Sequence, residues 1–378
     1  MKSATRAIAF ATLCLGIGLG TVLGAGLSAT PARADIALAL AGPFSGSAAI
    51  YGRQARSGAE AAVAAINAHG GLLGQRLVLA VADDACDDRQ SVELANRLVA
   101  QKVAVVIGPV CSGAAVAAST VYAEAGIPMI SPTATVPQLT ERGLRNVFRV
   151  CGRDDQQGEV AAALIADRFR DRTIAIVHDG QPYGQGLAGD VKRRLNAAGI
   201  GEAVFTGIAA GEQDYGALVS ALKEAGVEVL YYGGYDQELA LIARRMAKQG
   251  YHPQLIGADG IQPQTFWNVA GEAAEGTLFT FPPDPQRNPA AAPVVEGLKA
   301  RNIRSDGYTL FAYAAVQVYA QAVERAGSAK PDAVVKALRA GPADTVIGEL
   351  FFDGKGDPTK PGYVVWAWRD GKKVQLER

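Results

Sequence analysis

Residues 36–82 read IALALAGPFSGSAAIYGRQARSGAEAAVAAINAHGGLLGQRLVLAVA. Two apolar runs, 36–41 and 77–82, flank an alanine-rich segment, 53–68, which Gly70-Gly71 ends. Apolar runs without polar alternation are typical of strands that are covered on both faces of a sheet. Strands that alternate with helices in this way build a parallel sheet. The stretch therefore predicts the first strand–helix–strand unit of an α/β fold.

The same alternation continues along the rest of the chain. We expect further strands at 103–107, 128–131, 147–150, 173–178, 229–232 and 255–257, and helices at 89–101, 114–125, 155–169, 186–198, 217–225, 237–249, 310–326 and 332–340. The prolines of Phe281-Pro282-Pro283-Asp284-Pro285 predict a linker, and Asp370-Gly371 predicts a hairpin turn. Two α/β halves joined by a proline-rich crossing suggest lobes around a cleft, because ligands bind at the carboxyl ends of parallel strands.

Residues 1–34 have the pattern of a secretory signal. Lys2 and Arg6 supply the positive start, residues 8–27 are apolar, and Ala32-Arg33-Ala34 has the small-x-small pattern of a cleavage site. We expect the mature chain to begin at Asp35 and to work in the periplasm. A retained membrane anchor is the alternative, but glycines interrupt the apolar run and the cleavage motif follows it directly.

Composition argues against nucleic acid as a partner. The chain has 37 basic and 37 acidic residues, and loss of the signal segment leaves 34 basic and 37 acidic ones, a net charge of −3. A surface that binds phosphates needs the opposite balance. Three cysteines would remain, Cys86, Cys111 and Cys151, which permits at most one internal disulfide.

Five short motifs follow one another along the chain. They are Asp83-Asp84-Ala85-Cys86-Asp87, Gly108-Pro109-Val110-Cys111-Ser112, Ser131-Pro132-Thr133-Ala134-Thr135, His178-Asp179 with Tyr183-Gly184, and Tyr231-Tyr232-Gly233-Gly234-Tyr235. In this order and spacing the series resembles the periplasmic leucine/isoleucine/valine-binding proteins of branched-chain amino acid ABC transporters, over essentially the whole mature chain. The resemblance implies a type I periplasmic-binding fold, an α/β fold in which two Rossmann-like lobes with central parallel sheets are joined by three hinge crossings.

The resemblance also implies lobe boundaries and a disulfide. The N-terminal lobe would comprise residues 35–152 and 283–361, and the C-terminal lobe residues 153–282 and 362–378. The conserved disulfide of the family corresponds to Cys86–Cys111 in this sequence. Cys151 has no counterpart in that pattern, and we expect it to be a buried, inert thiol.

The same resemblance implies an amino-acid site between the lobes. For the ligand carboxylate it implies Ser112, Thr133 through its backbone, and Thr135 through its hydroxyl, close to a helix start that favours an anion. For the ammonium it implies Asp259, where the relatives usually have a longer glutamate, with the Tyr235 hydroxyl beside it. The ligand side chain would lie among Tyr51, Val110, Cys111, Tyr183 and Tyr308. Without the resemblance, the serine and threonines are better interpreted as helix caps, and each tyrosine taken alone as a packing or lobe-interface residue.

These residues predict a binding protein with no catalytic role and no cofactor. We expect it to capture an aliphatic, and more narrowly a branched-chain, L-amino acid by lobe closure, and to deliver the ligand to an ABC import permease as a monomer. Two alternatives stay open at this point. One is a binding protein for another small ligand, such as an aromatic acid, an amide or urea, and the other is a ligand-sensing partner of a separate receptor.

Three other signals in the sequence are weaker. The glycines of Gly184-Gln185-Gly186-Leu187-Ala188-Gly189 match a dinucleotide-binding motif, but they stand too far from the preceding strand. The acidic cluster Asp83-Asp84 with Asp87-Asp88 lacks the ligand spacing of a calcium loop, so no metal is expected. His69, His178 and His252 come without a nucleophile motif, which argues against hydrolysis.

Overall fold

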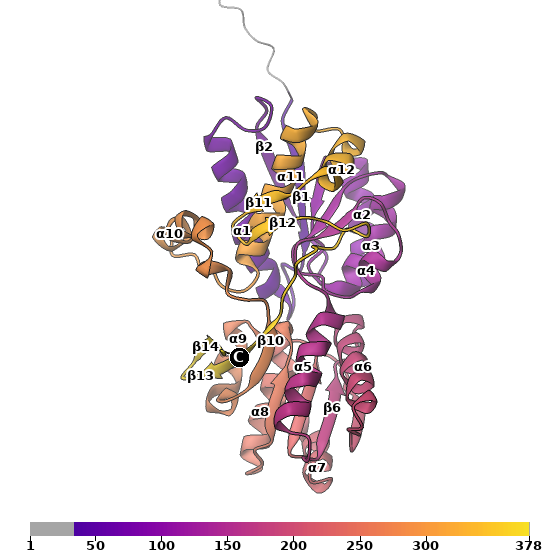
Figure 1. The fold of residues 1–378 in the computed structure, drawn as a ribbon, viewed down its shortest axis with the longest axis vertical. Helices are drawn as coiled ribbons and strands as arrows, with labels where there is room; N and C mark the ends of the chain where they lie inside the picture. The colour runs from indigo at the N-terminus through magenta and orange to yellow at the C-terminus, as the bar shows by residue number, and fades with distance from the viewer. Residues whose placement is uncertain (1–33, 378) are drawn as a thin grey trace, which may run out of the picture. The chain divides into compact units, whose positions relative to one another are not determined.

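The computed structural model describes residues 34–377. Apart from Ala34, the predicted signal segment lies outside the described residues, as does Arg378. The described chain builds two large sheets, and each has helices packed on both of its faces (Figure 1). This architecture confirms the predicted α/β fold.

The first sheet is parallel throughout, with the strand order β2-β1-β3-β4-β5. Its strands are β1 (Ile36–Gly42), β2 (Leu77–Asp83), β3 (Val105–Ile107), β4 (Met129–Ser131) and β5 (Val147–Arg149). One face packs on α1 (Ala49–Ala68) and α11 (Thr309–Ala326), and the other on α2 (Asp88–Ala100) and α3 (Ser112–Glu124). Neighbouring residues of β1 serve opposite faces, Leu38 the first and Ala39 the second, as the pleat requires.

The second sheet has the order β14-β13-β10-β9-β8-β6-β7. Its parallel strands are β6 (Ile174–His178), β7 (Val204–Gly207), β8 (Val229–Gly233), β9 (Gln254–Gly257) and β10 (Leu278–Phe281). Two antiparallel strands, β13 (Val364–Arg369) and β14 (Lys372–Gln375), complete one edge. Helices α5 (Asp154–Arg168) and α6 (Pro182–Ala197) cover one face, and α7 (Gly216–Glu224), α8 (Asp236–Lys248) and α9 (Gln264–Ala270) the other.

The chain passes between the two sheets three times. It crosses between β5 and α5, between β10 and α11, and between the small hairpin β11–β12 and β13. The remaining short elements are α4 (Gln138–Glu141), α10 (Ala292–Ala300), α12 (Pro331–Ala340), β11 (Ala343–Thr345) and β12 (Gly348–Leu350). The residues at which one lobe ends and the other begins stay a prediction.

Several elements differ from the expected ranges. Strand β7 was not predicted because it is an exposed edge strand, with Phe205 42% exposed, and lacks a continuous apolar run. Strand β10 was not predicted because it has only four residues and prolines follow it directly. Helix α6 begins at Pro182, four residues before the expected start, because proline is well suited to the first helical position. As a result Gly184, Gly186 and Gly189 all lie inside the helix, which explains the dinucleotide-like spacing.

The disulfide Cys86–Cys111 is confirmed, with the two Cα atoms 5.5 Å apart. It joins the loop after β2 to the residue that precedes α3. Cys151 is a buried free thiol, and burial raises its pKa well above the ordinary value. A thiol that stays protonated is a poor nucleophile, in line with the expected inert role.

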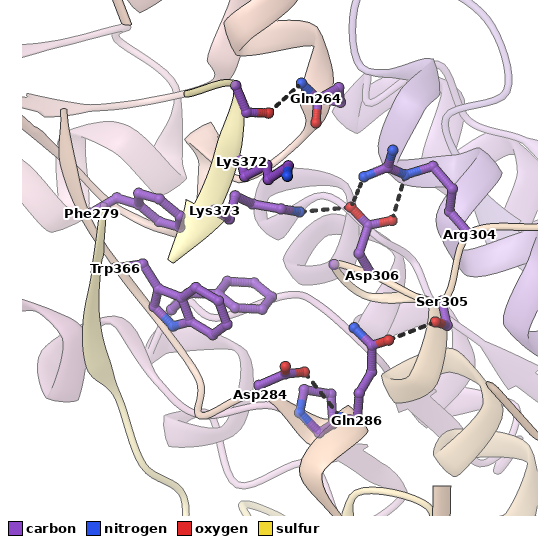
Figure 2. A pocket seen from close by; sticks show the side chains of 14 residues that line it. Gln264, Phe279, Asp284, Gln286, Arg304, Ser305, Asp306, Trp366, Lys372 and Lys373 are labelled. Carbon is purple, nitrogen blue, oxygen red and sulfur yellow. Dashed lines mark hydrogen bonds and ion pairs between the residues drawn. The ribbon is translucent and has the colours of Figure 1, made fainter. Parts of the chain in front are cut away.

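The C-terminal hairpin is also confirmed. Asp370 and Gly371 have φ values of 49° and 73°, the left-handed conformation that a two-residue hairpin turn needs at both central positions. The following residues, Lys372 and Lys373, line a cavity of about 550 Å³ beside the hairpin (Figure 2).

Candidate functional site

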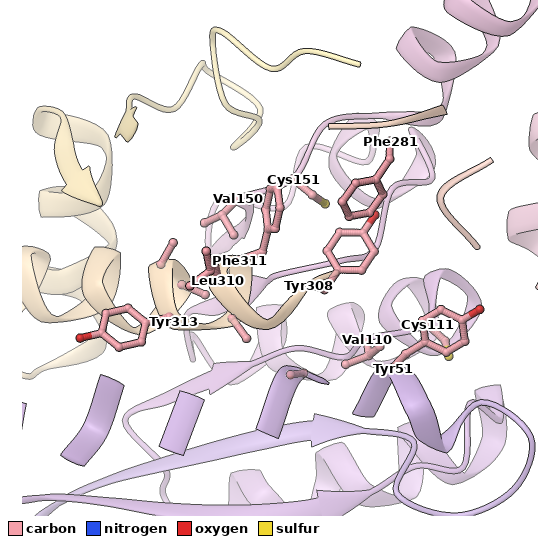
Figure 3. Packing of buried hydrophobic residues seen from close by; sticks show 14 of the residues in the cluster. Tyr51, Val110, Cys111, Val150, Cys151, Phe281, Tyr308, Leu310, Phe311 and Tyr313 are labelled. Carbon is pink, nitrogen blue, oxygen red and sulfur yellow. The ribbon is translucent and has the colours of Figure 1, made fainter. Parts of the chain in front are cut away.

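Four of the five residues expected to surround the ligand side chain belong to one buried cluster. Tyr51, Val110, Cys111 and Tyr308 are each at most 5% exposed, and Figure 3 shows them within this cluster. Tyr183 is equally buried but belongs to a smaller group with Leu187 and Ala258. The slot residues are thus brought together from α1, the start of α3, α6 and the start of α11.

Tyr235 packs against two of these tyrosines, edge to face on Tyr51 and tilted by 35° on Tyr183. The ring of Tyr235 lies 5.3 Å from that of Tyr51 and 5.1 Å from that of Tyr183. The hydroxyl of Tyr51 is not free to contact a ligand side chain. It donates to Asp236 Oδ1 at 2.7 Å and contacts the carbonyl of Gly260. Tyr51 lies on a helix of the first sheet and Asp236 on a helix of the second, so this hydrogen bond joins the two halves.

Ser112 is the first residue of α3 and does not act as its cap. The N-cap is Cys111, and its side chain caps nothing. Ser112 is 3% exposed. Within residues 34–377 its hydroxyl accepts one long hydrogen bond, of 3.4 Å, from the Val136 N–H. This geometry leaves the hydroxyl as a donor at a helix start, where the backbone dipole favours an anion.

Thr133 and Thr135 follow β4 and use their hydroxyls differently. Thr133 donates to the carbonyl of Val110 at 2.6 Å, which leaves its backbone for any ligand. The Thr135 hydroxyl is buried beside the Asp154 carboxylate, which it helps to keep charged, but within residues 34–377 it makes no hydrogen bond of good geometry. Since a buried polar atom without a partner costs free energy, this hydroxyl is suited to a ligand atom.

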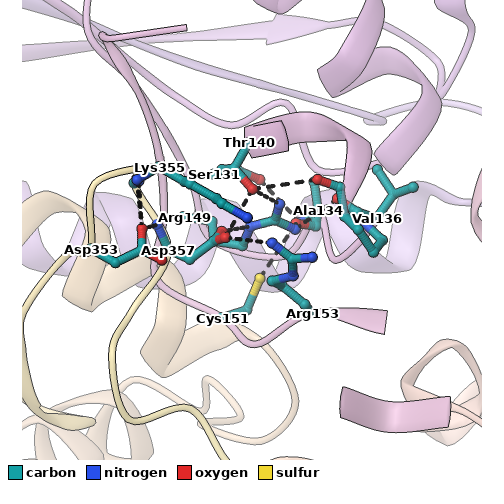
Figure 4. A network of polar contacts seen from close by, with 12 residues as sticks. Ser131, Ala134, Val136, Thr140, Arg149, Cys151, Arg153, Asp353, Lys355 and Asp357 are labelled. Atoms are coloured by element: carbon teal, nitrogen blue, oxygen red, sulfur yellow. Dashed lines mark hydrogen bonds and ion pairs between the residues drawn. The ribbon is translucent and has the colours of Figure 1, made fainter. Parts of the chain in front are cut away.

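A buried arginine fixes the loop that carries these threonines. Arg149, at the end of β5, donates to the carbonyls of Ala134 and Val136 at 2.9 Å each (Figure 4). Its Nε donates to Asp357 Oδ1 at 2.6 Å, and the guanidinium is fully buried. Because Ala134 and Val136 flank Thr135 in the chain, the arginine holds that residue in place.

Asp259 opens the short turn after β9 and receives three side-chain hydrogen bonds. Tyr183 donates to Oδ1 at 2.6 Å, Gln157 donates to the same oxygen at 2.7 Å, and Tyr308 donates to Oδ2. The expected neighbour, Tyr235, is not among these donors; the tyrosines assigned to the slot take that place. Burial raises the pKa of Asp259, while the three hydrogen bonds act in the opposite direction.

A second carboxylate, which the sequence did not single out, lies beside Asp259. Gln157 bridges the two, donating to Asp154 Oδ1 at 3.2 Å while it holds Asp259. Asp154 Oδ2 is buried and has no hydrogen-bond partner in the described part of the chain. Burial and the charge of Asp259 raise the pKa of Asp154 strongly. The Thr135 hydroxyl and the positive charge of Arg149 act in the opposite direction without cancelling that rise. Neither carboxylate forms an ion pair with another described residue, so the two together favour an added cation.

Other functions find less support within residues 34–377. There is no group of three or more histidines, cysteines, aspartates and glutamates that could hold a metal ion. His178 uses its ring Nδ1 to accept from the Gly180 N–H at 3.1 Å and packs against Phe205. No helix in this range has the length and hydropathy to span a bilayer.

Comparison with known proteins identifies the family of the chain. The sequence profile described as "Periplasmic binding protein" matches residues 35–372. The chain belongs to the periplasmic binding protein family. It is 47% identical to the Leu/Ile/Val-binding protein homolog 1 of Brucella melitensis, over 95% of this chain and 96% of that protein.

Two solved structures of the same family are similar in fold. The leucine-binding protein LivK of Thermotoga maritima has a TM-score of 0.83 and 27% identity, over 90% of this chain and 98% of that one. The branched-chain amino acid transporter substrate-binding protein LivJ of Streptococcus pneumoniae, solved with isoleucine, has a TM-score of 0.82 and 25% identity, over 90% and 100% of the two chains. The type I fold expected from the sequence motifs is therefore confirmed.

Proposed function

We propose that this chain is a periplasmic substrate-binding protein that captures an aliphatic, branched-chain L-amino acid and delivers it to an ABC import permease. The observation that carries the proposal is the pair of buried carboxylates, Asp154 and Asp259, which form no ion pair with another described residue. A ligand ammonium supplies the missing charge. The names of the relatives, Leu/Ile/Val-binding and leucine-binding, support the same ligand class.

The other end of the ligand would meet neutral donors. Ser112 at the start of α3 and Thr135 with its unpartnered hydroxyl are suited to a carboxylate. The tyrosines, Val110 and Cys111 would then enclose the aliphatic side chain. A zwitterion with an apolar side chain satisfies all three environments at once, whereas an aromatic acid, an amide or urea would leave two carboxylates buried without a cation.

Asp154 offers a reason why aspartate can stand at position 259, where the family resemblance predicts a glutamate. Asp259 reaches one methylene less far than a glutamate at the same place, and three donors hold its carboxylate. We infer that Asp154 supplies a second acceptor on the ammonium side, through the oxygen that has no partner within the described residues. The ammonium would then be shared between two carboxylates.

Capture would work by closure. Ser112 and Thr135 belong to elements of the first sheet, and Asp259 and Tyr183 to elements of the second. Only a closed arrangement contacts the ligand from both sides, so the ligand shifts the open–closed equilibrium by its differential affinity. The permease would recognise the closed form, and the protein would act as a monomer that makes and breaks no covalent bond. A periplasmic location follows from the family and from the predicted signal segment.

Isothermal titration of residues 35–378 tests the proposal. The protein is unfolded and refolded to remove retained ligand, and is titrated with leucine, isoleucine, valine, alanine, phenylalanine, GABA, benzoate and acetamide. We expect saturable binding of leucine, isoleucine and valine that is tighter than the response to the other compounds. Heat with benzoate or acetamide but with none of the amino acids would contradict the ammonium role of Asp259 and leave the fold assignment intact.

A further inference from the structure

The two halves meet at a second place, away from the carboxylate pair. The cavity beside the C-terminal hairpin is lined from both sides (Figure 2). Lys372 and Lys373 come from β14 of the second sheet, and residues 304–307 come from the loop just before α11, which packs on the first sheet. Contacts across this cavity therefore join elements of different sheets.

One ion pair makes that connection. Lys373 Nζ lies 2.7 Å from Asp306 Oδ2, and the two side chains are only 13% and 20% exposed. Arg304 also binds Asp306, through Nε at 3.0 Å and Nη2 at 2.9 Å, but it belongs to the same loop. Arg304 thus orients the carboxylate, and Lys373 is the partner from the opposite half.

A chain of hydrogen bonds leads from this pair toward the ligand cluster. Lys373 Nζ also donates to Gln262 Oε1 at 3.3 Å, and Gln262 Nε2 donates to Gln54 Oε1 on α1 at 2.9 Å. The same Gln54 oxygen accepts from the backbone N–H of Tyr308 at 3.2 Å. Tyr308 in turn donates to Asp259. The residues that join the halves are therefore connected to the residue that holds the carboxylate.

We propose that Lys373 and Asp306 form a latch that favours the closed arrangement, which makes Lys373 a positioning residue for closure on the ligand. Separation of the halves returns both side chains to water and breaks the pair. Because the pair is partly buried, it is screened by salt less than a surface pair, although the cavity gives ions access to it. This proposal rests on closure as the means of capture, which is part of the proposed function.

The first test needs no ligand. Spin labels at Glu124→Cys on α3 and Glu224→Cys on α7, both exposed positions at helix ends, report the distance between the halves by pulsed electron resonance. We expect Lys373→Ala to move the distance distribution of the ligand-free protein toward longer distances. The matched control is Lys372→Ala, a neighbouring exposed lysine for which the described residues show no ion pair. It should leave the distribution unchanged.

The second test measures the kinetics of leucine release. We expect Lys373→Ala to raise the dissociation rate about three- to tenfold with little change in the association rate, since the latch acts after encounter. Lys373→Arg keeps the charge and should restore most of the wild-type rate. Adding Asp306→Asn to Lys373→Ala should cost less than the sum of the two single changes. Thermal unfolding of each variant shows that the fold is intact.

The outcomes separate the latch from the proposed function. Distances and release rates of Lys373→Ala equal to wild type, or an equal effect of Lys372→Ala, would overturn the latch while leucine binding stands. A shift in the distances without any leucine binding by the wild-type protein would support the latch and contradict the proposed ligand.

Discussion

Replacing Asp259 with asparagine tests the ammonium site most directly. The change removes the negative charge and keeps the shape of a side chain that is 4% exposed. Removing one partner of a buried ion pair costs about 3–5 kcal/mol, which corresponds to a roughly 100- to 4,000-fold loss of affinity for leucine. If Asp154 shares the cation, one carboxylate remains and the loss falls near the lower end of that range.

The ligand-free protein should respond in the opposite sense. Burial raises the folded-state pKa of Asp259, so the charged carboxylate lowers the free energy of unfolding at pH values above the ordinary carboxyl range. Asp259→Asn should therefore leave the stability without ligand unchanged or slightly higher at pH 7–8. Leucine affinity of the wild type should fall as the pH falls through the folded-state pKa of Asp259, because only the carboxylate pairs with the ammonium, and the variant should show a flatter profile.

Titration calorimetry and urea unfolding together decide this prediction. The matched control is Asp84→Asn, since Asp84 is a fully buried aspartate whose pKa burial raises to about 7, and it follows β2 rather than β9. The control should bind leucine like wild type. A leucine Kd of Asp259→Asn within twofold of wild type, or an equal loss in Asp84→Asn, would refute the assignment.

Three further changes have defined outcomes. Ser112→Ala should weaken leucine binding by about 1.5–3 kcal/mol, the value of a hydrogen bond to a charged group, and unchanged calorimetric affinity would remove Ser112 from the carboxylate site. Asp84→Asn should raise the free energy of unfolding at pH 8 by up to about 4 kcal/mol, because a folded-state pKa of about 7 lies about three units above the unfolded value. Urea unfolding should show the difference shrinking as the pH falls from 7 to 4. Replacing Cys86 and Cys111 together by serine should cost ~3 kcal/mol of unfolding free energy in the chain-entropy account, and equal urea midpoints would argue against it.

The fold followed from the sequence where burial on both sides makes a strand continuously apolar. Strands β1, β6 and β8 were predicted on this basis, and they are central strands. The same reasoning missed β7, an edge strand in which exposed residues interrupt the apolar run. It did predict β2, but the expectation that this strand is covered on both faces is wrong, because β2 is an edge strand with Val78 44% and Val81 36% exposed. The order of the strands in each sheet was not predicted, because alternation alone does not fix it; it comes from the structure.

The sequence named candidate residues for the site, but it did not predict the hydrogen bonds between them. The roles of Ser112, Thr135 and Asp259 in binding stay predictions, and the donors to Asp259 are Tyr183, Tyr308 and Gln157 rather than Tyr235. Which of several tyrosines reaches one carboxylate depends on the packing of α6 and α11 around the turn after β9. Neighbouring residues along the chain carry no signal for that choice.

Asp154 is a candidate site residue that the sequence analysis missed. In the sequence Asp154-Asp155-Gln156-Gln157 is an ordinary acidic helix start, a pattern that a favourable interaction with the helix dipole fully explains. Only the fold turns Asp154 and Gln157 inward, to where Gln157 also bonds Asp259 across 102 residues. A charge at a helix start is thus ambiguous until its burial is known.

The contacts that join the halves suggest how closure can stay reversible. If the halves part as proposed, the contacts of Tyr51 with Asp236, Gln54 with Gln262, and Lys373 with Asp306 would all be exchanged for contacts with water. Each such exchange changes the free energy by only about 0.5–1.5 kcal/mol. Two buried carboxylates without a cation oppose closure by more than that, and an ammonium removes the opposition. On the proposed function, the ligand would act mainly by neutralising Asp154 and Asp259. Contacts such as the proposed Lys373–Asp306 latch would set the remaining free-energy difference between the open and closed arrangements.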